Sequence, residues 1–181
     1  ILADRPSLSL KGCKVIITAG PTHEPIDPVR YIANRSSGRQ GYALAAAAIE
    51  RGAETILISG PTALPAPSGA RTIRVATAEE MQRAAEKELP ADIAIFAAAV
   101  ADWRISNVSS EKIKKAGATK VPSLLLAENP DVLAHIARHA KRPRLVVGFA
   151  AETENVVANG KAKLKRKGAD LIIANDVSAK S

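Results

Sequence analysis

Several residue types and patterns are scarce in this chain of 181 residues. It has one cysteine, Cys13, which excludes an internal disulfide and a cysteine metal cluster and fits a reducing compartment, with the cytoplasm as the default. No apolar run approaches the roughly 20 residues that span a bilayer, and no secretory signal pattern is evident, so we expect no membrane association. The few aromatic residues are scattered, which disfavours a base-stacking surface for nucleic acid. They are Tyr31, Tyr42, Phe96, Trp103 and Phe149.

The two commonest nucleotide fingerprints are also missing. Neither G-x-x-x-x-G-K-[ST] nor G-x-G-x-x-G follows the first apolar run, where Ala19, Gly20 and Pro21 stand instead. This disfavours a dinucleotide-dependent dehydrogenase, although such a protein would share the predicted architecture. Positive charge, by contrast, is plentiful, because 26 Lys and Arg against 18 Asp and Glu give a net charge of +8. An anionic partner is therefore expected, and a polyphosphate substrate explains the excess as well as nucleic acid does.

Apolar runs alternate along the chain with segments of helical periodicity. Because these runs are apolar throughout, they predict a Rossmann-like open parallel sheet with helices on both faces, in one α/β domain. Thr77 and Glu80 form a capping-box pattern, and Asn129 followed by Pro130 predicts another helix start. The expected strands are 14–18, 54–59, 71–75, 93–98, 145–149 and 171–174, and the expected helices are centred on 42–49, 77–88, 129–140 and 155–167.

The loop from Ala19 to Gly41 is too long to be a simple connector. It leads into a helix, whose first N–H groups are unpaired and whose dipole favours negative charge. Hydroxyl groups and glycines there would suit a phosphate, with Arg35 or Arg39 as counter-charge. The alternative is that Ser-Ser-Gly only caps the helix. The candidate residues are Ser36, Ser37, Gly38 and Gly41.

Small residues follow the apolar run that ends near Phe96. Main-chain groups of Ala97, Ala98 and Ala99 could read the edge of a nucleobase, while Asp102 could accept from an amino group. The alternative is that these alanines pack against a helix and that Asp102 lies on the surface. We therefore predict a nucleobase slot in this segment and leave the packing interpretation open.

Two basic segments are further candidates. The EKIKK run at 111–115 fits a flap whose Lys112 or Lys114 contacts a phosphate, or else a solvated loop. Lys163 and Lys167 lie four residues apart and share a helix face, which is either a phosphate contact or a solvated surface. The histidines form no metal-ligand spacing with acidic neighbours, so no protein metal site is predicted. They are His23, His135 and His139.

Six motifs, in order along the chain, resemble a known family. They are ITAGPTHEPIDPVRYIANRSSGRQG, AAAVADWR, EKIKK, ENPDVL, VGFAAET and KLKRKGADLIIANDVS. Together they resemble phosphopantothenoylcysteine synthetase, the synthetase half of the bacterial bifunctional coenzyme A biosynthesis protein. The resemblance covers nearly the whole chain. It implies a synthetase domain at 12–181 that lacks the C-terminal end of the family domain, with a linker remnant at 1–11.

The resemblance implies a role for individual residues. Asn34 matches an asparagine that processes an acyl-cytidylate intermediate, Arg30 an arginine that handles substrate, and Lys112 a flap lysine that helps to form the intermediate. Substrate contacts are implied at Arg30, Asn34, Ala98 and Ala99. Nucleotide contacts are implied at Ser36, Ser37, Gly38, Gly41, Phe96, Ala97, Ala98, Asp102, Lys112, Asn129, Pro130, Asp131, Val132, Phe149, Lys163 and Lys167.

The implied activity is that of a ligase that joins 4′-phosphopantothenate to L-cysteine. The carboxylate attacks the α-phosphorus of CTP and releases pyrophosphate, and the cysteine amine then displaces CMP. Mg²⁺ is expected to travel with the triphosphate. The resemblance also implies a homodimer and, in the full-length protein, fusion to a flavin-dependent decarboxylase. The residues themselves leave CTP and ATP open, and the bacterial type of the resemblance favours CTP.

Overall fold

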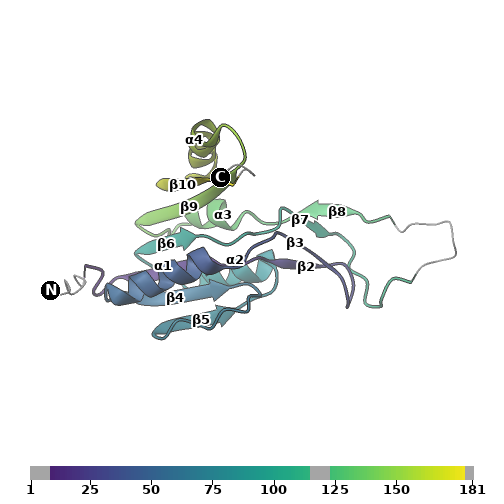
Figure 1. Cartoon of the computed structure of the whole chain (residues 1–181), viewed down its shortest axis with the longest axis horizontal. Coiled ribbons are helices and arrows are strands. Elements are labelled where there is room, and N and C mark those ends of the chain that lie inside the picture. Colours follow the sequence, from purple (N-terminus) through teal and green to yellow (C-terminus); the bar gives the residue numbers. More distant parts are fainter. Residues whose placement is uncertain (1–8, 115–122, 178–181) are drawn as a thin grey trace.

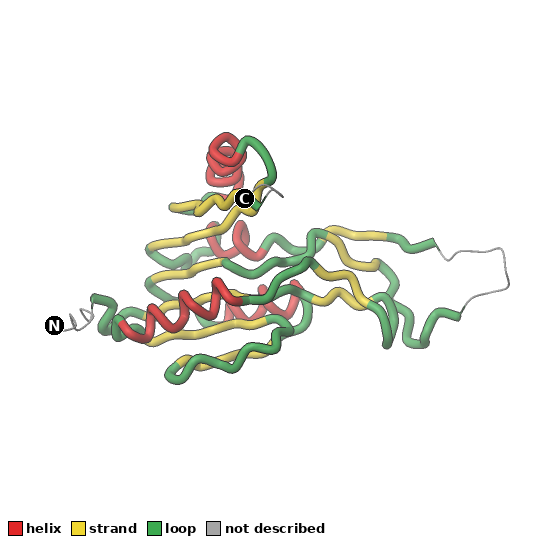
Figure 2. The backbone as a smooth tube through the Cα atoms, viewed as in Figure 1, coloured by secondary structure: helices red, strands yellow, loops and turns green. Residues whose placement is uncertain are grey.

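A six-stranded sheet forms the centre of the part of the chain that the structure describes (Figures 1 and 2). The computed structural model describes residues 9–114 and 123–177. The strands lie in the order β10-β9-β6-β1-β4-β5, and all neighbours are parallel. The predicted Rossmann-like open parallel sheet is thus confirmed. The strands are β1 (Lys14–Ala19), β4 (Glu54–Ser59), β5 (Ala70–Arg74), β6 (Ile93–Phe96), β9 (Leu145–Glu152) and β10 (Leu171–Asp176).

Helices cover both faces of the sheet, because its strands bury alternate side chains on opposite sides. On one face Ile17 packs with Tyr42 and Ala45 of α1. On the other, Ile16 packs with Met81 of α2 and with residues of α3. No helix among the described residues is long and apolar enough to cross a membrane. The helices are α1 (Arg39–Glu50), α2 (Ala78–Lys87), α3 (Val132–Ala137) and α4 (Val156–Lys167).

The chain order reverses between β1 and β6. From β1 the chain moves outward through β4 and β5, then returns to β6 and moves the other way through β9 and β10. The segments that follow β1 and β6 both leave the sheet at this point. Ligands of open α/β sheets bind at such a switch point, beyond the carboxyl ends of the strands.

Two short antiparallel hairpins extend from this same edge, to the right of the sheet in Figures 1 and 2. One joins β2 (His23–Pro25) to β3 (Tyr31–Ala33), and the other joins β7 (Trp103–Ile105) to β8 (Leu126–Glu128). The sequence interpretation missed both and treated 19–41 as one loop. The predicted linker remnant at 1–11 lies largely outside the described residues, as does the last residue of the predicted 111–115 run.

Several predicted element boundaries need correction. The strand expected at 93–98 ends at Phe96. The helix expected at 129–140 is α3, which is shorter and has Asp131 rather than Asn129 as its N-cap. Asn129 does not cap it, because the Asn129 main-chain and side-chain amides donate instead to the carbonyls of Asp102 and Ala101.

The start of α2 confirms the predicted capping box. The Thr77 hydroxyl accepts from the Glu80 N–H, and the Glu80 carboxylate accepts from the Thr77 N–H. The structure adds a second, tertiary cap, because the buried Glu24 carboxylate of β2 accepts from the Ala78 N–H at 2.9 Å. This contact ties the first hairpin to the helical layer and so fixes the hairpin beside the switch point.

Candidate functional site

The segments that follow β1 and β6 run side by side beyond the sheet. The Ala99 N–H donates to the Gly20 carbonyl at 2.9 Å, and the Thr22 hydroxyl accepts from the Ala101 N–H at 3.0 Å. The N–H groups of residues 97 and 98 bond Thr18. These four N–H groups are thus already used inside the protein. The predicted nucleobase slot is narrowed accordingly, because these four amides are not free to bind a ligand and the Ala98 and Val100 side chains pack against the core.

Two asparagine side chains hold this segment by its carbonyl groups. The Asn34 side chain donates to the Val100 carbonyl at 2.9 Å, and the Asn129 side chain donates to the Ala101 carbonyl at 2.8 Å. Asn34 is exposed. The Asn129 Oδ1 atom is buried and has no hydrogen-bond partner among the described residues. A buried acceptor of this kind is costly unless a ligand or water supplies a donor.

The first turn of α1 begins at Gly38, which has φ 77°, and no described side chain caps it. The Ser36 and Ser37 hydroxyls accept from the N–H groups of Gly38 and Arg39 at 3.3 and 3.5 Å. These bonds form turns ahead of the helix, so the capping alternative does not describe this helix start. The anion-site prediction for Ser36, Ser37 and Gly38 stays a prediction.

The two predicted glycines of this turn have packing roles. A Cβ atom on Gly38 would lie 2.8 Å from the Thr62 methyl carbon, and one on Gly41 would lie 2.4 Å from the Ala19 Cβ. Gly41 is buried, so its missing side chain lets α1 approach β1. The sequence predicts that both glycines make room for a phosphate. At Gly41 the neighbouring strand β1 occupies that room instead.

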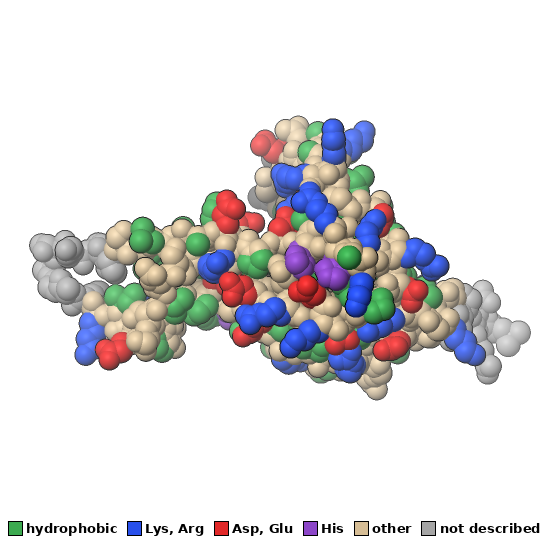
Figure 3. Space-filling model, turned by 180° about the vertical axis from the view of Figure 1, so that it is seen from behind, with side chains coloured by type: hydrophobic (Ala, Val, Ile, Leu, Met, Phe, Trp, Pro, Cys, Tyr) green, Lys and Arg blue, Asp and Glu red, His purple; other side chains and the backbone are tan. Residues whose placement is uncertain are grey.

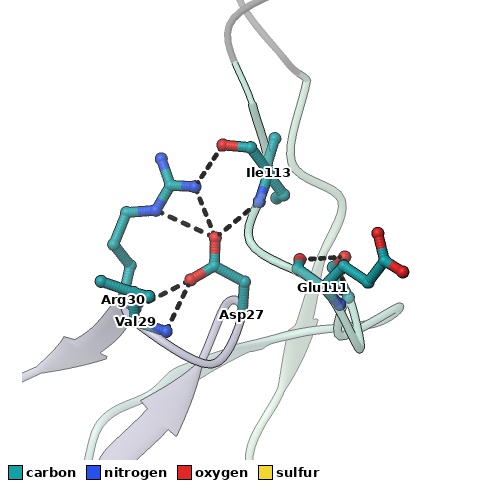
Figure 4. Close-up of polar contacts among 6 residues, drawn as sticks. Asp27, Val29, Arg30, Glu111 and Ile113 are labelled. Carbon is teal, nitrogen blue, oxygen red and sulfur yellow. Dashed lines mark hydrogen bonds and ion pairs between the residues drawn. The ribbon is translucent and has the colours of Figure 1, made fainter.

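Arg30 and Lys112 lie on segments that meet at Asp27 (Figure 4). The Arg30 guanidinium pairs with the Asp27 carboxylate and donates to the Ile113 carbonyl at 2.8 Å. The guanidinium, with nearby backbone N–H groups, holds the pKa of the Asp27 carboxyl well below its usual value although burial opposes this. Lys112 precedes Ile113 and is exposed. The sequence interpretation missed Asp27, although an Asp before Pro28 is a common turn signal.

The predicted basic pair also finds partners near the site. Lys163 donates to the Phe149 carbonyl at 2.7 Å, and Lys167 pairs with Asp131. Burial and repulsion by Lys167 lower the pKa of Lys163. Burial raises the pKa of Asp131, but Lys167 and the Ala134 N–H outweigh it and keep that pKa below its ordinary value. The two lysines therefore lie beside the start of α3 rather than on a purely solvated face.

Other predicted nucleotide contacts are less accessible. Phe96 and Val132 are buried in the core, with 7% and 4% of their surface exposed, so only their main chain could face a ligand. Asp102 is exposed and Pro130 half-buried. Pro130 and Asn129 line an open cavity of about 460 Å³ between α2 and the β7–β8 hairpin. Of these positions, Asn129 and Pro130 are therefore the ones that border an open cavity.

One histidine in α3 and one just beyond it have an acidic neighbour that the sequence spacing did not reveal. His135 and His139 Nε2 lie 3.6 and 3.5 Å from the Glu86 carboxylate of α2. Figure 3 shows this helical side of the molecule, with Lys and Arg side chains spread over it. No group of three or more candidate ligands that could hold a metal ion occurs in the described part of the chain.

Known proteins share both sequence and fold with this chain. The model of the DNA/pantothenate metabolism flavoprotein C-terminal domain family matches residues 10–181. The chain belongs to this family. Among curated relatives it is 49% identical over 176 residues to the coenzyme A biosynthesis bifunctional protein CoaBC of Escherichia coli (strain K12), covering 96% of this chain and 43% of that protein. For CoaBC of Mycobacterium tuberculosis (strain ATCC 25618 / H37Rv) the identity is 48% over 179 residues, covering 93% and 43%.

Solved structures agree with this assignment to the DNA/pantothenate metabolism flavoprotein C-terminal domain family. A crystal structure of the C-terminal domain of CoaBC superimposes with a TM-score of 0.82 at 40% identity, covering 95% of this chain and 81% of the other. A Cab2 mutant in complex with phosphopantothenate-cysteine matches with a TM-score of 0.73 at 19% identity, covering 96% and 73%, and shows a shared fold. The resemblance drawn from the six motifs is thus confirmed, and the chain spans less than half the length of these curated relatives.

Proposed function

We propose that this chain is a phosphopantothenate–cysteine ligase of coenzyme A biosynthesis, which joins 4′-phosphopantothenate to L-cysteine. The observation that carries the proposal is that predicted site residues from separate segments of the chain lie near the switch point. Asn34 and Asn129 hold the segment after β6 by its carbonyl groups, and Lys163 and Lys167 lie beside the start of α3. The family membership and the CoaBC relatives support the same activity.

The nucleotide in this proposal is CTP, accompanied by Mg²⁺. A carboxylate is a poor electrophile, so its oxygen first attacks the α-phosphorus, which releases pyrophosphate and leaves an acyl-cytidylate. Lys112, Lys163 and Lys167 offset the phosphate charge. The buried Asn129 Oδ1 offers an acceptor to an amino group, which a cytosine or an adenine carries. Mg²⁺ would accompany the triphosphate and offset part of its charge, and we assign no residue of this chain as its ligand.

The second step is attack by the cysteine amine, with CMP as the leaving group. The Asn34 side-chain nitrogen carries two hydrogens, of which one is used by the Val100 carbonyl. The second can donate to the carbonyl oxygen as it becomes an oxyanion. Because the Val100 contact fixes the amide in advance, the donor needs little reorganisation when charge develops.

The proposal extends to the whole protein. We infer a homodimer, fusion to a flavin-dependent decarboxylase as in a bifunctional protein, and a cytoplasmic location. CoaBC relatives of more than twice this length support the fusion. Sedimentation of the full-length protein, with mass determination of any bound flavin, tests the first two points.

The experiment is pyrophosphate release measured with 4′-phosphopantothenate and either CTP or ATP, with and without cysteine. We expect release with CTP before cysteine is added. Asn34→Ala should retain this release and lose about 100- to 1000-fold in product formation, the usual cost of one oxyanion donor, so the activated intermediate accumulates. Normal product formation by Asn34→Ala would contradict the assigned role, and absence of nucleotide-dependent release in the unaltered protein would contradict the proposed function.

A further inference from the structure

The turn between β2 and β3 is organised around one buried carboxylate. The Asp27 side chain is fully buried although it is charged. Its Oδ1 accepts from the N–H groups of Val29 and Arg30, both at 2.9 Å, which closes the turn. Its Oδ2 faces the other way and accepts from the Arg30 guanidinium and from the Ile113 N–H at 3.1 Å. One oxygen therefore builds the hairpin and the other reaches a segment more than eighty residues away.

Ile113 is held on both sides of its main chain (Figure 4). Its N–H donates to Asp27, and its carbonyl accepts from the Arg30 guanidinium at 2.8 Å. A further contact joins the same two regions, because the Ser109 N–H donates to the Ile26 carbonyl at 3.1 Å. The backbone of Lys112 thus lies between two fixed points, at 109 and at 113.

We propose that Asp27 is a positioning residue that acts through Arg30 and Ile113 to fix the backbone that carries Lys112. This inference rests on the proposed function, in which Lys112 contacts the nucleotide phosphates. Lys112 has a long side chain, and holding its backbone in place reduces the conformational entropy lost when its ammonium reaches a phosphate. The Arg30 guanidinium is committed to Asp27 and Ile113, so in this proposal Arg30 also acts by holding this segment.

The charge of Asp27 is what makes this clamp strong. Charge-assisted hydrogen bonds are about twice as strong as neutral ones, and Asp27 makes them to Arg30 and to main-chain N–H groups. Removing the charge of Asp27 leaves these donors without a charge-matched acceptor, which is costly. The two sides of Asp27 can nevertheless be separated by substitution, because each oxygen has its own set of donors.

The decisive variant is Asp27→Asn in the full-length protein. An asparagine oxygen can still accept from Val29 and Arg30 and close the turn. Its NH₂ group then faces the Ile113 N–H and the Arg30 guanidinium, which are also donors, so the clamp is lost. We expect pyrophosphate release to fall about 10- to 100-fold in kcat, as for a small misplacement of a catalytic group, with the KM for CTP within about twofold because uniform binding is unchanged.

A mutant cycle with Lys112→Ala tests whether the effect passes through that lysine. If Asp27 positions Lys112, Asp27→Asn causes no further loss in the Lys112→Ala background. Equal losses in both backgrounds would overturn the proposal. Asp92→Asn is the matched control, because the Asp92 carboxylate also accepts a main-chain N–H, that of Lys14 at 2.9 Å, at the opposite end of β1. This control should lower stability without lowering kcat in the folded protein.

Hydrogen exchange provides a readout that does not depend on activity. Peptides covering 106–114 should lose protection in Asp27→Asn and keep it in Asp92→Asn, and unchanged exchange in Asp27→Asn would overturn the clamp even if the protein proved to have another activity. Should Asp27→Asn fail to fold, Ile113→Pro removes the N–H donor directly, whereas Ile113→Ala keeps both main-chain contacts. We expect loss of kcat for Ile113→Pro and near-normal kcat for Ile113→Ala, and equal behaviour of the two would overturn the proposal.

Discussion

The helices α1 and α2 begin in opposite ways. At α2, Thr77 and Glu80 form a capping box and the buried Glu24 carboxylate binds the Ala78 N–H, so the protein itself supplies the negative charge that a helix start attracts. At α1 the cap position is Gly38 in the left-handed region, and no described side chain caps the helix. The α2 start is therefore completed by the fold, whereas at the α1 start the Ser37 hydroxyl lies 3.5 Å from the Arg39 N–H and we propose that a phosphate supplies the negative charge.

The third case, α3, lies between these two. Its N-cap Asp131 accepts from the Ala134 N–H at 3.0 Å, and its second oxygen pairs with Lys167. The cap is therefore linked to a lysine that we propose as a nucleotide contact. The three helix starts therefore differ in how far the protein itself neutralises the positive end of the helix dipole. Each start can be altered by a separate substitution.

The largest expected effect comes from making α1 resemble α2. Ser36→Asp places a carboxylate beside the N–H of Gly38, where it competes with a phosphate. We expect nucleotide affinity to fall about 100-fold, or about 2.8 kcal/mol, because like charges a few ångströms apart repel at the protein surface. Calorimetric titration with CTP measures this. Ser36→Asn is the neutral control, and an equal loss in both variants would mean that charge is not the cause.

The left-handed start of α1 should be sensitive to any side chain. Gly38→Ala is expected to lower the free energy of unfolding by about 1–2 kcal/mol, since the left-handed conformation disfavours a Cβ, and the Thr62 methyl carbon would be 2.8 Å away. Gly168→Ala is the matched control, because φ there is 71° and nothing lies within 4 Å. Denaturant unfolding should show the larger loss for Gly38→Ala. Equal losses would assign the whole effect to backbone conformation.

At the capped helix α2, a substitution should lower stability without changing nucleotide affinity. Thr77→Ala removes one acceptor from the capping box and is expected to cost about 1 kcal/mol in the free energy of unfolding. Nucleotide affinity should not change, since Glu24 still satisfies the Ala78 N–H and the α2 start is not a proposed ligand site. Paired unfolding and titration experiments measure both quantities, and a weaker affinity for CTP would break the comparison.

The smallest expected effect is the pH dependence of the α3 start. The pKa of Asp131 is lowered in the folded protein. Its contribution to stability is therefore fully present above the unfolded value of about 3.9 and is lost as the pH falls through the lowered folded pKa. For this partly exposed pair with Lys167 we expect less than about 1 kcal/mol. Lys167→Met should have a lower free energy of unfolding than the unaltered protein at pH 7. Denaturant unfolding should show this difference shrinking in acid, where Asp131 is protonated.

The sheet and the capping box could be predicted because their signals are local. The KVIIT run at 14–18 and the ETILIS run at 54–59 are apolar enough to indicate buried strands, and both are confirmed as β1 and β4. Gly52 follows α1 with φ 85°, the left-handed conformation that glycine commonly adopts just beyond the end of a helix. Such features depend on composition and on conformational preference within a few residues, which a single sequence contains.

The hairpins and the exact start of α3 could not be predicted for the opposite reason. β2 and β7 have three residues each, HEP and WRI, which is too short for periodicity, and β7 pairs with a strand more than twenty residues away. Asn129 looked like a helix cap, but its amide bonds Ala101 instead. The contact of Asp27 with Ile113 joins residues far apart in the sequence and exists only in the folded chain. The site roles implied by the resemblance stay predictions.

The alanine-rich segment after β6 is held through its main chain. Thr18 and Thr22 accept from its amides, and Asn34 and Asn129 donate to its carbonyls, so none of these bonds uses an alanine side chain. A larger side chain at Ala97 or Ala99, which are half-buried, would leave these bonds available, whereas Ala98 and Val100 pack against the core and Ala101 is buried. The position of this segment thus depends little on which side chain stands at 97 or 99, and these are the two places along it where sequence change would cost the fold least.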